Sequence, residues 1–120
     1  KRQDYIRNTL LSELTTDNSL FGHGILGSYP YVGTYPHNIV LDFLFSFGWI
    51  FGILILVSIC LLMVKMLIRC RKNEDLLVFG LLLIVGSILK MCFSGTYIDD
   101  TLFFFLIGYC VQYGWRNKTL

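Results

Sequence analysis

Residues 43–64 read FLFSFGWIFGILILVSICLLMV, a run of 22 residues without an acidic or basic side chain. An α-helix rises about 1.5 Å per residue, so a helix of this length covers the ~30 Å hydrocarbon layer of a bilayer. An uninterrupted apolar run of this length is typical of a membrane span and not of a buried helix in a soluble protein. The stretch therefore predicts a transmembrane helix, and this helix sets the class of the whole chain.

The composition agrees with a membrane protein. The 120 residues are 55% hydrophobic and 15% charged, whereas soluble domains average about 45–50% apolar and about 25% charged residues. The net charge of +2 is too small to indicate nucleic acid as a partner. The chain starts with Lys1 and not with methionine, so we expect a piece of a longer or processed protein.

Two further apolar runs follow the first. Residues 76–93 contain a single charged residue, Lys90, whose methylenes can lie along a helix while its ammonium reaches the headgroups. Residues 101–115 contain no charge and end in aromatic residues, as interfacial belts do. We therefore predict an all-α integral membrane fold with three transmembrane helices, at about residues 39–64, 76–93 and 101–115. An outer-side helix and a glycine- and tyrosine-rich loop precede them.

Basic residues predict the orientation of these helices. They lie between the first two runs and after the third: Lys65, Arg69, Arg71, Lys72, Arg116 and Lys118. By the positive-inside rule, residues 65–75 and the C-terminus are cytoplasmic. Residues 1–38 then form a periplasmic loop segment, and residues 39–120 form the multi-pass transmembrane region.

The outer segment opens with a predicted amphipathic helix. Apolar residues recur at helical spacing between Asp4 and Leu14, namely at Tyr5, Ile6, Leu10, Leu11 and Leu14. Gly22, Gly24 and Gly27 follow, and they let a backbone approach a ligand closely, although a flexible loop is the simpler interpretation.

Polar residues mark the start of the first predicted span. We expect His37 and Asn38 in its first turn, where the imidazole can accept a proton near neutral pH or be an interfacial residue without a role. Asp42 is costly against lipid, so it is expected to face protein or water. Gly48 and Gly52 form a GxxxG pattern, which favours close helix packing. Asp99 and Asp100 could bind sugar hydroxyls, but we expect them to be solvated.

Metal and redox chemistry find no support in the sequence. No His, Cys or carboxylate cluster has the spacing of metal ligands, and the four cysteines contain no CxxC pair. We expect the cysteines to act as small apolar packing residues, and we expect no cofactor.

The order of these motifs resembles the C-terminal part of the O-antigen polymerase and O-antigen ligase family. The resemblance rests on a short amphipathic helix, Leu20-Phe21-Gly22-His23-Gly24, a tyrosine-rich stretch, Pro36-His37-Asn38 and Gly48-Trp49-Ile50-Phe51-Gly52. It implies a multi-spanning glycosyltransferase of the bacterial inner membrane that polymerises oligosaccharide repeat units carried on undecaprenyl diphosphate. Such an enzyme works beside a chain-length regulator and a flippase of the same pathway.

The resemblance also implies roles for individual residues. His37 matches the family's motif histidine, which acts as general base or orients the acceptor hydroxyl. Either Arg2 or Arg7 matches an arginine that contacts the diphosphate, and Tyr35 and Asn38 join the substrate-binding set. Arginine alone would then neutralise the donor phosphates, without a metal.

Two alternatives to a polymerase remain at this point, and by itself this piece of the protein is expected to be inactive. An O-antigen ligase would transfer the glycan to the lipid A core. A non-enzymatic transporter or flippase component would use Asp42 and Lys90 as a polar route. A transporter needs polar groups spread through the membrane depth, whereas chemistry needs them gathered at the outer mouth. The sequence has Asp42 and Lys90 near the predicted outer ends and no ionisable residue at mid-span, which favours an enzyme.

Overall fold

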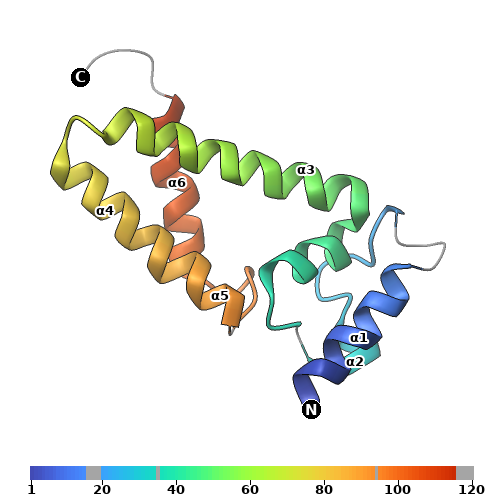
Figure 1. Ribbon diagram of the computed structural model, residues 1–120. Helices are drawn as coiled ribbons and strands as arrows, with labels where there is room; N and C mark the ends of the chain where they lie inside the picture. Colours follow the sequence, from blue (N-terminus) through green and yellow to red (C-terminus); the bar gives the residue numbers. More distant parts are fainter. Residues whose placement is uncertain (16–19, 35, 94, 116–120) are drawn as a thin grey trace.

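The computed structural model describes residues 1–15, 20–34, 36–93 and 95–115, and all regular elements in those ranges are helical (Figure 1). In chain order they are α1 (Arg2–Leu14), α2 (Tyr29–Val32), α3 (Ile39–Cys70), α4 (Glu74–Ile84), a π-helical segment η2 (Val85–Leu89), α5 (Lys90–Phe93) and α6 (Thr101–Trp115). The predicted all-helical class is confirmed for these residues.

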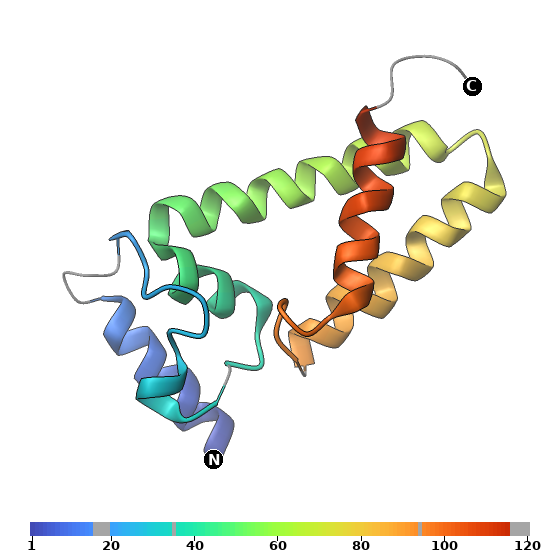
Figure 2. The ribbon, with the colours of Figure 1, turned by 180° about the vertical axis from the view of Figure 1, so that it is seen from behind.

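The C-terminal half consists of three helical segments arranged as a wedge, namely the long part of α3, the continuous α4–η2–α5 helix, and α6. From the turn after Cys70, α3 and the continuous α4–η2–α5 rod diverge, and α6 lies between them in both views (Figures 1 and 2). Buried Met66, Leu83, Leu106 and Cys110 fill the narrow end of the wedge. Two of these helices, Ile39–Cys70 and Glu74–Phe93, are long and apolar enough to cross a membrane, whereas α6 has only 15 residues.

Helix α3 is broken at Gly48. This glycine has φ 79° and ψ 177°, outside the helical region, so α3 consists of a first arm, residues 39–47, and a long arm, residues 49–70. The two arms meet at a sharp corner, where a β-carbon on Gly52 would lie 3.0 Å from the Leu44 α-carbon. Gly48 packs closely, as expected of a GxxxG glycine, but against the backbone of residues 20–22 and not against another helix. Its own backbone is not helical and adopts a conformation that only glycine takes easily.

The glycine-rich segment is docked onto this corner. The His23 amide donates to the Phe45 carbonyl at 2.8 Å, and the Gly24 amide donates to the Ser46 carbonyl at 3.0 Å. The last carbonyls before a helix break lack intrahelical donors, so these amides supply what the first arm cannot. Gly22 packs so closely on Gly48 that a β-carbon on either residue would overlap the other's backbone. The segment is therefore held by the fold, contrary to the flexible loop that the sequence favoured.

Helix α1 covers the other side of the first arm. Its buried residues Ile6, Leu10 and Leu14 form one apolar cluster with Leu41, Leu44 and Phe45. The indole Nε1 of Trp49 donates to the Leu14 carbonyl at 2.9 Å and so ties the end of α1 to the corner. The buried face of α1 is narrower than the sequence predicted, since Tyr5 and Leu11 are exposed.

Candidate functional site

His37 and Asn38 lie immediately before α3. Asn38 is the N-cap of the helix, and its Oδ1 accepts from the Val40 amide at 2.9 Å and the Leu41 amide at 3.3 Å. The half-buried His37 has φ 52°, a left-handed conformation that is uncommon outside glycine, although histidine, asparagine and aspartate tolerate it best. The sequence suggested that His37 and Asn38 lie within the first turn of the helix. In the structure they precede that turn.

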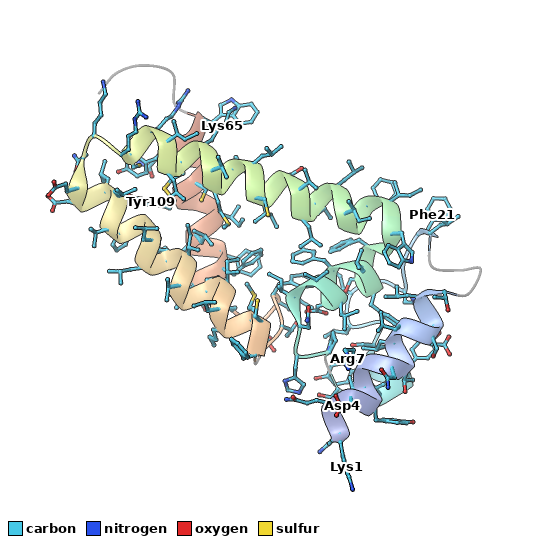
Figure 3. The ribbon with its side chains drawn as sticks, in the orientation of Figure 1. Lys1, Asp4, Arg7, Phe21, Lys65 and Tyr109 are labelled. Atoms are coloured by element: carbon cyan, nitrogen blue, oxygen red, sulfur yellow. The ribbon has the colours of Figure 1, made fainter. Side chains whose placement is uncertain are left out.

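The two candidate arginines lie on α1. The Arg7 Nη2 is 3.6 Å from the Asp4 Oδ1, and both side chains are exposed (Figure 3). Arg2 begins the helix and is also exposed. Helix α1 packs against the first arm of α3 (Figures 1 and 2). Arg2 is the first residue of α1, and His37 precedes the Asn38 N-cap of α3. Tyr35 lies outside the described residues.

Asp42 lies on the first arm of α3 and is buried against protein, as the sequence predicted. Only 6% of the residue is exposed, and the Thr96 hydroxyl donates to its Oδ2 at 2.5 Å. Tyr97, the next residue, stacks on Phe43 with ring centroids 4.5 Å apart. Burial raises the pKa of the Tyr97 phenol above its ordinary value. These contacts attach the segment before α6 to the start of α3.

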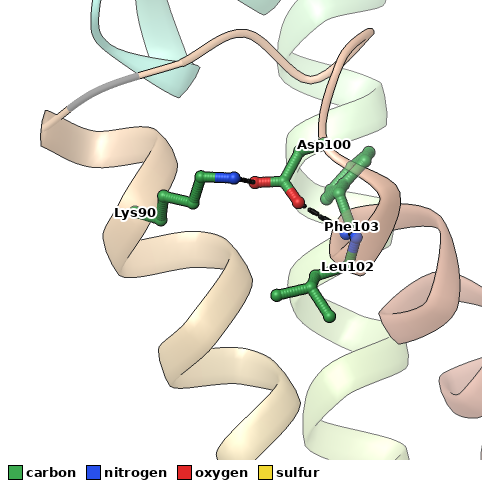
Figure 4. Close-up of polar contacts among 4 residues, drawn as sticks. All are labelled: Lys90, Asp100, Leu102 and Phe103. Carbon is green, nitrogen blue, oxygen red and sulfur yellow. Dashed lines mark hydrogen bonds and ion pairs between the residues drawn. The ribbon is translucent and has the colours of Figure 1, made fainter.

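A second polar pair joins α5 to the start of α6 (Figure 4). The Asp100 Oδ1 accepts from the Leu102 amide at 3.0 Å and the Phe103 amide at 3.3 Å, which makes Asp100 the cap of α6. Its Oδ2 lies 3.3 Å from the Lys90 Nζ. The expectation that Asp100 is solvated was wrong, because the residue is 3% exposed, whereas Asp99 is exposed as expected.

A small cleft lies beside this ion pair. It has a volume of about 120 Å³ and is lined by Lys90, Gly95, Thr96, Asp99 and Asp100. Because Thr96 also contacts Asp42, the cleft connects the ion pair to the buried carboxylate of the first arm. The Lys90 ammonium can donate to hydroxyl or phosphate oxygens, and the exposed Asp99 carboxylate can accept from hydroxyls. The outer loop with Asp99 and Asp100 was visible in the sequence, but its contacts with Lys90 and Asp42 were not.

His23 lies at the corner of α3. Its ring stacks on Phe45 at 4.3 Å and meets the edge of Tyr31 at 5.4 Å between centroids. The buried Nδ1 has no hydrogen-bond partner among the residues that the structure describes. These contacts make His23 part of the packing that holds the glycine-rich segment.

The adjacent carboxylates Asp99 and Asp100 should respond differently to truncation. Asp100→Ala removes the cap of α6 and leaves two helix amides without a partner, so we expect the free energy of unfolding to fall by about 1–2 kcal/mol. Asp99→Ala, one residue earlier and exposed, should change it by less than about 0.5 kcal/mol. Denaturation of the purified chain in detergent micelles measures both, and equal losses would contradict the capping role.

Within the described ranges, no group of three or more His, Cys, Asp or Glu side chains is placed to hold a metal ion. No family model matches the chain, no curated protein matches it, and no solved structure matches it. The function is therefore inferred from the residues and their geometry.

Proposed function

We propose that the chain is the C-terminal, membrane-embedded part of a glycosyltransferase that extends a glycan carried on a polyprenyl diphosphate. The observation that carries this proposal is the grouping of polar side chains at one end of strongly apolar helices. Asp42, Thr96, Lys90 and Asp100 meet there, and His37 directly precedes the N-cap of the helix that carries Asp42. No ionisable acid or base lies between Phe43 and Val64.

The apolar surface supports a place in the bilayer. In the most apolar 18-residue stretch of α3 only 11% of the residues are buried, and in that of α4–η2–α5 only 22%. The core helix of a soluble protein would be mostly buried, whereas a lipid-facing helix has this exposure. We therefore assign both helices as membrane spans and α6 as a third, shorter span packed between them.

The charges support one orientation of these spans. Lys65, Arg69, Arg71 and Lys72 cluster at the turn between α3 and α4, and this turn is the cytoplasmic side in our proposal. The opposite end, with His37, the Lys90–Asp100 pair and residues 1–38, then faces the periplasm. Arg116 and Lys118, which agree with this orientation, lie outside the described residues.

The chemistry requires a base and cationic groups on that outer side. Transfer from a diphosphate leaving group needs donors for the phosphate oxygens and an acceptor for the proton of the incoming hydroxyl. In our proposal the imidazole of His37 takes this proton, and Arg2 or Arg7 binds the diphosphate. The left-handed backbone of His37 supports its role, since strained conformations concentrate at functional sites. Asn38 acts through the helix start that it caps.

Accessibility of position 37 tests the proposal. In the complete protein, His37→Cys should react with a membrane-impermeant maleimide in spheroplasts, while Lys72→Cys in the α3–α4 turn should react only after lysis. The chain without an added cysteine gives the background from Cys60, Cys70, Cys92 and Cys110. Labelling of position 37 only from the cytoplasmic side would overturn both the orientation and the proposed reaction.

A further inference from the structure

A set of exposed apolar side chains surrounds the docked glycine segment. We call Leu20, Phe21, Ile25 and Leu26 the loop rim, and their exposed fractions are 50%, 75%, 66% and 47%. Phe21 projects away from the body of the molecule beside the corner of α3 (Figure 3). The rim cannot easily turn inward, because the His23 and Gly24 amides between its two halves are bonded to α3. These side chains are therefore presented outward by the fold.

The sequence around the rim lacks the charges of a solvated loop. Residues 18–41 contain no Asp, Glu, Lys or Arg, which is a stretch of 24 residues. A contiguous apolar surface usually marks an interaction site. A partner that binds through charge would find no Asp, Glu, Lys or Arg among these residues.

The position of the rim along α3 indicates which partner covers it. The rim is fixed beside the start of the long arm, where Trp49, Ile50 and Phe51 are also exposed. From Trp49 to Arg69 the helix rises about 30 Å, the thickness of the hydrocarbon layer. If Arg69 lies at the inner interface, Trp49 and the rim lie at the outer one, where tryptophan is enriched.

We infer that Leu20, Phe21, Ile25 and Leu26 insert into the outer leaflet of the bilayer at the level of Trp49. The glycine segment is then a membrane-inserted anchor and not a loop in the aqueous phase. This inference rests on the proposed membrane location of α3 and adds a second lipid contact to it. It fixes the height of α1 and of Arg2 and Arg7 above the lipid, because α1 is tied to the same corner through Trp49 and Leu14.

Depth-dependent quenching tests the anchor. A fluorescent amino acid is introduced by codon suppression at Phe21, at Tyr5 or at Leu61 of the full chain, so that all native cysteines stay in place. Tyr5 is the matched control, an aromatic residue of 65% exposure on α1, and Leu61 is 61% exposed within the long arm. Each protein is reconstituted into phosphatidylcholine and phosphatidylglycerol vesicles, either with acyl-chain-brominated lipid or with iodide added to the buffer.

The inference predicts a distinct pattern for the three positions. The labels at 21 and 61 should lose most of their fluorescence with brominated lipid and little with iodide, and the label at 5 should do the reverse. Quenching of position 21 by iodide, or by neither agent as under a protein partner, overturns the anchor while position 61 still reports a membrane span. Iodide quenching of position 61 overturns the membrane location itself, and the proposed function with it.

Discussion

Gly48→Ala is expected to lower the free energy of unfolding by about 3 kcal/mol or more. The backbone of Gly48, with φ 79° and ψ 177°, lies in a region that is essentially restricted to glycine, and forcing another residue into it costs about 1–3 kcal/mol. The added β-carbon would also overlap the carbonyl of Leu20 and the amide of Gly22, which are backbone atoms without freedom to rotate away. The variant must therefore straighten α3 or release the glycine segment.

Two other glycines distinguish the cost of the backbone conformation from the cost of the steric overlap. Gly24→Ala meets no atom within 4 Å but keeps a φ of 83°, so its loss should equal the conformational cost alone. Gly108→Ala lies in helix α6, also in open space, and should be neutral or stabilising by up to about 1 kcal/mol. Denaturation in micelles compares the three variants. A Gly48→Ala loss no larger than that of Gly24→Ala would show that the close contact with Gly22 contributes nothing.

The position of α3 was predictable, but its break was not. The uncharged run of residues 43–64 indicated a helix, and the structure extends that helix to Ile39–Cys70. Glycines are frequent in apolar helices and often only permit close packing, so nothing local distinguished Gly48 from Gly52. The break depends on a partner 26 residues away, Gly22, whose backbone fits against it.

The candidate site shows the same division between local and distant information. The burial of Asp42 followed from the cost of a carboxylate near lipid, but its partner Thr96 lies 54 residues away and no periodicity connects them. The N-cap residues of α3 and α6 could have been predicted from the sequence, since an Asn or Asp directly before an apolar helix is a known start signal. That signal assigns Asn38 and Asp100 to capping positions, whereas we had expected Asn38 within the first turn and Asp100 in solvent.

His37→Ala in the complete protein is expected to abolish glycan elongation while membrane insertion stays intact. A general base contributes about 10²–10⁴-fold to a proton-transfer step, and a loss of that size removes the ladder of long chains. Silver-stained lipopolysaccharide from a deletion strain that carries the variant reports the result. A full ladder would count against His37 as a catalytic residue.

Alanine alone leaves one ambiguity, because it also strains the backbone at φ 52°. His37→Asn resolves it: asparagine adopts the left-handed conformation readily but has no group that accepts a proton near neutral pH. We expect His37→Asn to keep the unfolding free energy of the parent protein and to lose elongation as completely as His37→Ala does. If His37→Asn elongates normally while His37→Ala does not, position 37 acts through the turn into α3, and the proton must be taken by another group.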